Sequence, residues 1–379
     1  MLPGDAANQE PTMPDTPPPA PALKEIFNLA RIEHIAEQMA AVLPGFDQQR
    51  FITQTSEGLE QRSIMQRMAH IADCLHTVMG LEFAPAIEVL TALAPRLNSS
   101  FVTLSLPHYV ATHGQPHFEL AMQALAHFTT FGSAEFAIRA FLLADFERTL
   151  AVMEGWALSD NEHVRRLASE GSRPRLPWAA RLPQVQHNPD SVAALLGSLK
   201  ADPSLYVRKS VANHLNDITK DHPDWVLDTL HTWQSENPHT RWITRHALRS
   251  LIKQGHPRAL AMIGASGAPQ LQVENFSITP AQLRLGESMQ LGCTLVSSAD
   301  SAQQLVVDYA IDFVKSNGQA SAKVFKLKNL ALPAGGRANI QRTQHIRALT
   351  TRKHYLGVHR VHLLVNGERV ASGQFELID

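Results

Sequence analysis

Apolar residues follow a helical period from residue 23 to about residue 260. In LKEIFNLARIEHIAEQMAAVL, steps of three and four residues place Leu29, Ile32, Ala36, Met39 and Leu43 on one helix face. The segment EQRSIMQRMAHIADCLHTVM repeats this pattern. Prolines recur between such segments and divide them into short helices, which excludes one long coiled coil. We therefore predict an array of short amphipathic helices over residues 23–264.

After Gly264 the apolar period changes from 3.6 to two. Strands are predicted for LQVENFSI, SMQLGCTLV, QQLVVDYAIDFV, KVFKLKNL, VHRVHLLV and GQFELI. Asn-Gly pairs at 317–318 and 366–367 indicate hairpin turns. Short strands of this kind over residues 270–379 predict a β-sandwich of immunoglobulin type, without its disulfide. The two cysteines of the chain, Cys74 and Cys293, fall in different predicted domains, so we expect both to be buried and reduced.

Four of the predicted helices share one sequence pattern, in which a helix-start signal is followed about two turns later by a basic residue in an apolar stripe. The pairs are Ser133 with Arg139, Asp160 with Arg166, Asp202 with Lys209, and Asn237 with Arg245. The basic residues are spaced by 27, 43 and 36 positions, and the last two spacings bracket the period of HEAT-type helix pairs. The predicted fold is therefore a HEAT-like α-helical repeat solenoid followed by an immunoglobulin-like β-sandwich.

The net charge of −1 conceals an asymmetry along the chain. Residues 1–128 carry 6 Lys+Arg and 13 Asp+Glu, a balance of −7, whereas residues 129–379 carry 28 and 22, a balance of +6. An anionic partner is expected to meet the second part. Residues 1–22 hold seven prolines and few apolar side chains, and we predict a disordered arm. Without a signal peptide or a membrane-spanning run, the expected location is the cytoplasm, beside the nucleoid.

Carboxylates interrupt the predicted basic face. Glu135 and Glu170 each lie four residues from a marked arginine, and Asp217 lies eight residues after Lys209. Such pairs are ordinarily solvated helix pairs that stabilise a helix by about 0.3–0.5 kcal/mol. Alternatively, they stabilise a cation, because acids on a surface that only bound phosphates would weaken binding. Both interpretations stay open at this point.

Two further features have alternative explanations. Arg241, Arg245 and Arg249 form a stripe at four-residue spacing, which either neutralises DNA phosphates or is a solvated helix face. The proline-rich segment GSRPRLPWAARLP holds Trp178, which either anchors a loop on the core or presents its face to a cationic base. Close metal-ligand spacing and phosphate-binding glycine loops are not found in the sequence, and we expect no metal and no cofactor.

The segments SAEFAIRAFLLADFERTL, NEHVRRLASEGSRPRLPWAARLP, DPSLYVRKSVANHLNDITKDHPDWVL and RWITRHALRSLIKQG closely resemble the AlkC family of DNA alkylation repair glycosylases, relatives of AlkD. The resemblance covers residues 22–264, and the β-domain resembles the immunoglobulin-like extension of one branch. It implies hydrolysis of the N-glycosidic bond of 3-methyladenine and 3-methylcytosine without extrusion of the nucleotide. The partner would be double-stranded DNA containing alkylated bases, bound by a monomer and without a membrane.

The resemblance also implies site residues. Glu170 would stabilise an oxocarbenium-like sugar and position water, Trp178 and Glu135 would contact the cationic lesion or the sugar, and Asp217 would add supporting electrostatics. The expected DNA contacts are Arg139, Arg166, Arg173, Arg175, Lys209, Arg241, Arg245, Arg249, Arg347, Arg352 and Lys353. The basic group of the β-domain, which also includes Arg342, His345 and His354, either closes around DNA or protects a strand edge. The alternative function is a non-catalytic helical-repeat scaffold that binds DNA or protein.

Overall fold

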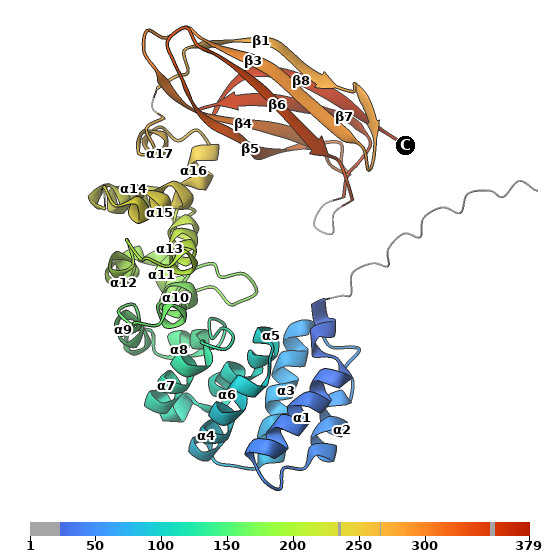
Figure 1. Ribbon diagram of the computed structural model, residues 1–379, viewed down its shortest axis with the longest axis vertical. Helices are drawn as coiled ribbons and strands as arrows, with labels where there is room; N and C mark the ends of the chain where they lie inside the picture. Colours follow the sequence, from blue (N-terminus) through green and yellow to red (C-terminus); the bar gives the residue numbers. More distant parts are fainter. Residues whose placement is uncertain (1–22, 234–235, 266, 349–352) are drawn as a thin grey trace, which may run out of the picture. The chain divides into compact units, whose positions relative to one another are not determined.

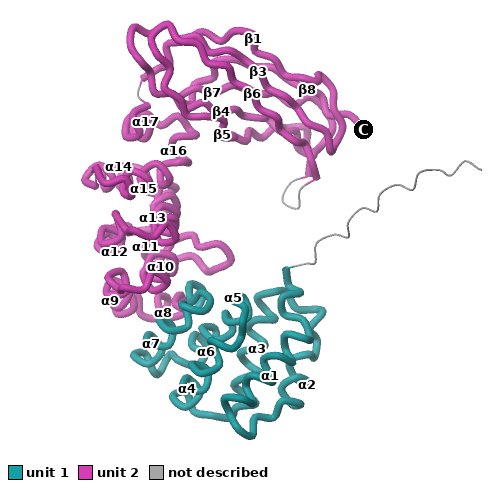
Figure 2. Tube along the Cα trace, viewed as in Figure 1, with its two compact units in different colours: residues 1–137 teal, residues 138–379 magenta. Residues whose placement is uncertain are grey.

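The computed structural model describes residues 23–233, 236–265, 267–348 and 353–379 (Figure 1). The chain divides into two compact units, one up to Ala137 and one from Ile138 onward (Figure 2). The boundary falls within the predicted helical domain. The predicted arm at 1–22 lies outside the described residues.

Over its described residues, the first unit has helices as its only regular secondary structure. Its α-helices are α1 (Leu29–Val42), α2 (Gln48–Ser56), α3 (Ile64–Met79), α4 (Phe83–Leu93), α5 (Ser100–Thr103), α6 (Ser105–His113) and α7 (Phe118–Phe128), with short 3-10 helices at Leu23–Phe27, Ala94–Arg96 and Gln115–His117. In the part of the chain described, no single helix is long and apolar enough to cross a membrane; α3 and the Phe83–Arg96 segment pass that test only as a pair bent by 119°.

Local sequence signals define the ends of these helices. Ser63 and Gln66 form a capping box at the start of α3, in which each side chain accepts a hydrogen bond from the backbone N–H of the other residue. Gly80 ends α3 in the left-handed conformation, with φ of 59°. Along α1, Ile32, Ala36 and Met39 are buried, as the apolar spacing predicts, whereas Leu29 at the start of the helix is exposed.

The second unit begins with a further series of short helices. They are α8 (Ile138–Ala144), α9 (Phe146–Trp156), α10 (Glu162–Gly171), α11 (Pro183–His187), α12 (Ala193–Ser198), α13 (Leu205–Ile218), α14 (Pro223–Thr232), α15 (Pro238–Ala247), α16 (Arg249–Lys253) and α17 (Pro257–Ala261), with a 3-10 helix at Pro189–Val192. Helix α13 packs between α10 and α15. The surface shared by α10 and α13 positions most of the candidate site.

The second unit ends in a sandwich of two sheets. Its strands are β1 (Leu271–Thr279), β2 (Gln282–Arg284), β3 (Ser288–Ser297), β4 (Gln303–Val314), β5 (Ala320–Leu332), β6 (Arg337–His345), β7 (Gly357–Val365) and β8 (Glu368–Ile378). One sheet has the order β1-β3-β6 and the other β2-β8-β7-β4-β5. The six predicted strands and both hairpin turns are confirmed. The sequence prediction missed β2, which has three residues, and β6, in which only Ile340 is buried.

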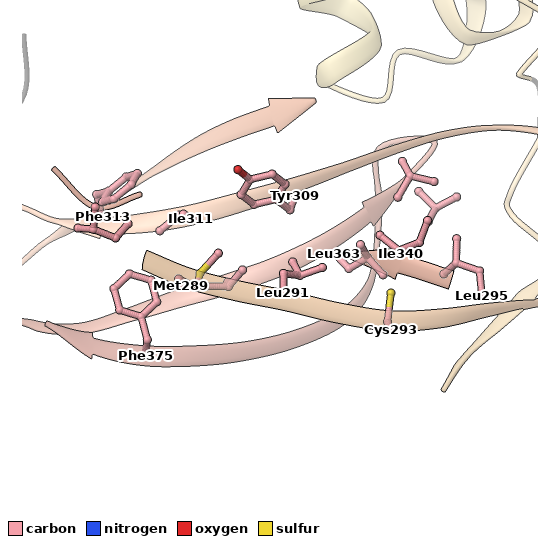
Figure 3. Packing of buried hydrophobic residues seen from close by; sticks show 14 of the residues in the cluster. Met289, Leu291, Cys293, Leu295, Tyr309, Ile311, Phe313, Ile340, Leu363 and Phe375 are labelled. Atoms are coloured by element: carbon pink, nitrogen blue, oxygen red, sulfur yellow. The ribbon is translucent and has the colours of Figure 1, made fainter. Parts of the chain in front are cut away.

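Apolar side chains from both sheets fill the interior of the sandwich (Figure 3). Leu291 and Cys293 of β3 alternate toward this core, and Tyr309 and Ile311 of β4 enter it from the other sheet. The Tyr309 hydroxyl donates to Gln344 Oε1 over 2.5 Å, so its polar end has a partner. Cys74 and Cys293 are both buried and unpaired, as expected.

Candidate active site

A buried group of charged side chains lies between α10 and α13. The guanidinium of Arg173 donates from Nη1 to Glu170 Oε1 over 2.6 Å and from Nε to Asp217 Oδ2 over 2.9 Å. All three side chains are less than a tenth exposed. One guanidinium therefore connects two carboxylates that are 47 positions apart in the chain. We call these three residues the Glu170–Arg173–Asp217 cluster.

The end of α10 brings the cluster together. Gly171 closes the helix against α8, where an added Cβ would lie 2.5 Å from Cγ2 of Ile138, so a larger residue does not fit without movement. The chain then turns, and the Arg173 N–H donates to the Glu170 carbonyl over 3.3 Å. This turn directs Arg173 toward α13. In this structure Arg173 is buried between two carboxylates, and its predicted contact with DNA stays a prediction.

The two carboxylates differ in how fully their oxygens are used. Glu170 Oε2 accepts a hydrogen bond of 2.6 Å from the Ser210 hydroxyl, and Oε1 lies 3.5 Å from Arg166 in addition to Arg173. Asp217 Oδ1 instead meets Lys220 Nζ at 3.3 Å, and the Lys220 side chain is 51 % exposed. A half-exposed lysine can move aside at little cost. Asp217 Oδ1 is therefore the more approachable oxygen.

Burial and neighbouring charges shift the pKa of two groups in this region, Arg173 and His214. Burial opposes the charged form of Arg173, but Glu170 and Asp217 outweigh this effect and raise the pKa of the guanidinium. His214 of α13 is fully buried and its Nδ1 lies 3.0 Å from the Ser169 carbonyl. Burial and the nearby Arg173 lower the pKa of His214 to about 3, so the imidazole is neutral at physiological pH. The sequence prediction missed Ser210 and His214.

Arg139 is a structural residue in this region. Its Nη1 donates to the carbonyls of Gly171 and Arg173 over 3.0 and 2.8 Å, and its Nη2 donates to Ala180. The side chain is buried, and burial lowers its pKa to about 10. The expectation that Arg139 contacts DNA from the surface is therefore wrong. Instead it holds the backbone on both sides of the loop that follows α10.

That loop, residues 172–182, extends away from the helices between α10 and α11 (Figure 1). Leu176 and Leu182 are buried and anchor it, while Trp178 is 66 % exposed and has φ of 65°. A bulky residue in the left-handed region is uncommon and suggests a functional constraint. The interpretation of Trp178 as the core anchor is therefore wrong. The indole is presented outward instead.

The loop is also fixed by an ion pair. Arg175 Nη2 lies 2.6 Å from Asp221 Oδ1 on the segment that follows α13, and both side chains are partly exposed. The Leu182 N–H also donates to the Pro174 carbonyl over 3.2 Å. Arg175 thus has a carboxylate partner of its own. This contact connects the loop to α13, the helix that carries Asp217.

Glu135 belongs to the other compact unit and lies in the turn before α8. The Ser133 hydroxyl donates to Glu135 Oε2 over 2.5 Å. Since α8 begins only at Ile138, the prediction that Glu135 and Arg139 share a helix face is wrong. Ser133 does not cap a helix, because the residues between it and Ile138 form a turn.

The remaining basic residues of the helices differ in exposure. Arg166 lies over the ring of Tyr206, 5.0 Å from its centroid, while Lys209 and Arg245 are exposed. Arg241 is also exposed and forms an ion pair with Glu236 at 2.9 Å. The predicted stripe is interrupted at Leu248, where α15 ends.

Arg249, the third member of that stripe, starts α16 and is directed inward. It donates to Asn213 Oδ1 over 3.0 Å and to the His246 carbonyl over 2.8 Å, and burial lowers its pKa. Two of its donors are therefore satisfied within the helices, and because the side chain is only partly exposed, Arg249 does not continue a fully exposed stripe.

Arg342, Arg347 and Lys353 of the sandwich are exposed, whereas Arg352 lies outside the described residues. His345 Nδ1 lies 2.6 Å from the Ser288 hydroxyl, so this histidine has a partner within the sheet. His354 packs against Phe313, with 5.2 Å between the ring centroids. Among the residues that the structure describes, no group of three or more His, Cys, Asp or Glu side chains could hold a metal ion.

Comparisons with known proteins match both parts of this architecture. Residues 117–251 match the family described as DNA alkylation repair enzyme, and residues 272–379 match the C-terminal Ig-like domain of the uncharacterised protein YhaZ. YhaZ of Bacillus subtilis is 38 % identical over 356 residues, which cover 94 % of this chain and 99 % of that protein. Pseudomonas fluorescens alkylpurine DNA glycosylase AlkC, solved bound to DNA containing an abasic site analog, is 60 % identical. That structure has a TM-score of 0.93, and the match covers 95 % of this chain and all of the AlkC chain.

Proposed function

We propose, on the premise that this chain belongs to the AlkC family of DNA alkylation repair enzymes with a C-terminal immunoglobulin-like domain, that it is a DNA glycosylase for cationic alkylated bases. The observation that carries the proposal is the Glu170–Arg173–Asp217 cluster, two buried carboxylates next to a loop that presents an indole. The proposed substrates are 3-methyladenine and 3-methylcytosine in double-stranded DNA. Each is a small base that carries a positive charge.

The chemistry of these lesions fits an anionic site. An alkylated cationic base leaves as a neutral molecule, so its departure needs little help from a general acid. The sugar left behind becomes oxocarbenium-like, and carboxylates stabilise that positive charge and orient the attacking water. Because Arg173 and Ser210 hold the carboxylates in place, no reorganisation is needed when the charge develops.

Within this mechanism Glu170 stabilises the sugar cation and Asp217 adds to the negative potential. The half-exposed Lys220 gives way from Asp217 Oδ1 when DNA binds. Trp178 meets the cationic lesion through its ring face, an interaction worth about 0.5–2 kcal/mol. Its exposure on a projecting loop favours contact with a base that stays in the duplex. Glu135 is a second proposed contact with the lesion or sugar.

Release of free 3-methyladenine from methylated DNA tests the proposal. Glu170→Gln keeps the shape of the side chain and removes its charge, so we expect loss of release with retained DNA binding. Asp202→Asn is a matched control, since Asp202 is a buried carboxylate paired with Arg165 at 2.7 Å outside the cluster. Wild-type release rates from Glu170→Gln would contradict the assignment, and DNA binding without any release by the wild type would favour the non-catalytic scaffold.

We also propose that the immunoglobulin-like domain contacts DNA through its exposed basic residues, including Arg347 and Lys353. Charge reversal of both residues to glutamate should weaken DNA binding and reduce its dependence on salt, since fewer counterions would be released. Arg360 of β7 and Arg369 of β8 are also exposed, and reversing both to glutamate provides a control with the same change of net charge. Equal losses from the two double variants would assign the effect to net charge alone.

A further inference from the structure

Two glycines meet where the helices of the second unit adjoin the sandwich. Gly255 follows α16 with φ of 74°, and Gly367 lies in the turn between β7 and β8 with φ of 83°. A Cβ added to Gly367 would lie 2.2 Å from Cα and 2.8 Å from N of Gly255. A Cβ added to Gly255 would lie 3.0 Å from Cα of Gly367. The two turns therefore touch backbone to backbone, which leaves no space for a side chain.

Each turn is firmly connected to its own domain. The Gly255 N–H donates to the Ile252 carbonyl over 2.9 Å, and this bond closes the end of α16. On the other side, Asn366 makes a reciprocal pair of 2.9 Å hydrogen bonds with Val306 of β4, one through its backbone N–H and one through Oδ1. A movement of either turn would therefore move the domain that carries it.

The rest of the junction is less closely packed. Within the described part of the second unit, no helix packs extensively against a strand. A small cavity of about 60 Å³ lies nearby, lined by residues of both domains that include Lys253, Asp308 and Lys326. Asn366 Nδ2 adds one long hydrogen bond of 3.4 Å to the Gly267 carbonyl. Contact between the two glycine turns is therefore a close backbone-to-backbone approach of the two domains.

We infer that Gly255 and Gly367 are positioning residues, whose direct backbone contact sets the orientation of the immunoglobulin-like domain on the helices of the second unit. A fixed orientation presents the basic residues of both domains to one DNA duplex without an entropic penalty for aligning them. The link to DNA rests on the proposed function. The orientation itself does not, so the two can be tested apart.

Gly367→Asn isolates the contact, because asparagine tolerates a left-handed backbone but adds a Cβ. Gly335→Asn is the matched control: Gly335 also lies in a sandwich turn, with φ of 63°, and an added Cβ there meets nothing within 4 Å. Nitroxide labels on exposed Ala194 of α12 and Ala322 of β5 report the distance between the domains by double electron–electron resonance. We expect one narrow distribution for the wild type and Gly335→Asn, and a shifted or broadened one for Gly367→Asn.

Binding to a methylated duplex provides the second readout. We expect Gly367→Asn to bind about tenfold more weakly, as the effective concentration of the second domain falls. Its excision rate at saturating enzyme should stay unchanged, since the cluster is untouched. If Gly367→Asn does not fold, Gly255→Asn replaces it, because its added Cβ makes the milder contact. The inference is overturned if the folded variant has the distance distribution of Gly335→Asn, whatever the DNA result; a wild type that does not bind DNA contradicts only the proposed function.

Discussion

The second unit contains two interiors of opposite character. Leucine, isoleucine, valine and aromatic side chains fill the space between the sheets of the sandwich. The interface of α10 and α13 instead buries Glu170, Arg173, Asp217 and His214. Burial of ion pairs is expensive and often stabilises a protein less than apolar packing would. The sandwich interior is therefore explained by stability alone, whereas we propose a functional reason for the charges that the helix interface retains.

Arg173→Ala should have the largest effect on stability. It leaves two buried carboxylates without a partner, and we expect a loss of about 3–5 kcal/mol in the free energy of unfolding. Arg175→Ala removes a partly exposed ion pair with Asp221 and should cost about 0–1 kcal/mol. Chemical denaturation measures both. Equal losses in the free energy of unfolding would show that the buried cluster contributes no more to stability than a partly exposed ion pair.

We expect buried His214 to make the free energy of unfolding depend on pH through the interface of α10 and α13. Its pKa is about 3 in the folded protein, below the ordinary value of 6.5, so the unfolded chain takes up the proton first as the pH falls. Its contribution is complete above pH 6.5 and is lost progressively toward pH 3; between pH 7 and pH 5 the loss is about 2 kcal/mol. Denaturation of His214→Asn at the two pH values should show a smaller drop than the wild type. An identical drop would assign the pH dependence to other groups.

Ile340→Val tests the apolar side of the comparison. Ile340 of β6 is buried in the sandwich core, and removal of one methylene should cost about 1 kcal/mol of stability. Excision of 3-methyladenine should not change, because the site is in the helices. A loss of excision in a folded Ile340→Val protein would mean that the two interiors are not independent.

The smallest effect is expected at the exposed surface. Arg245→Ala should leave stability unchanged and reduce the slope of log K against log salt concentration by about 0.9, the value for one phosphate contact. Titration of a DNA duplex over a range of salt concentrations measures this slope. An unchanged slope would remove Arg245 from the DNA-binding surface.

Sequence periodicity was sufficient to predict the helical array, six strands and two hairpin turns, because these depend on local spacing. The same spacing placed Glu170 beside Arg166, which the structure confirms at 3.5 Å. It could not reveal that Arg139 is buried, because that burial depends on carbonyl partners from a loop more than 30 positions away. Carbonyl groups carry no residue-specific signal.

The connection of Glu170 to Asp217 through Arg173 was missed for a related reason. Spacing identified each carboxylate, but their meeting requires α10 and α13 to pack and Arg173 to turn inward after Gly171. The resemblance implied a DNA contact for Arg173, and the spacing gave no sign that this side chain is buried between the two carboxylates. The reverse holds for Trp178, for which a buried anchor was one interpretation and which is exposed. Its left-handed backbone and its exposure depend on how the loop folds.

The rate at which Asp217→Asn releases 3-methyladenine under single-turnover conditions, with enzyme in excess over methylated DNA, tests the central claim most directly. Asp217→Asn and the control Asp202→Asn each remove the charge of a buried carboxylate paired with an arginine, but only Asp217 belongs to the cluster. We predict that Asp217→Asn is slower by about a hundredfold, the scale for loss of one preorganised electrostatic group, while Asp202→Asn keeps the wild-type rate. Equal rates for the two variants would contradict the account.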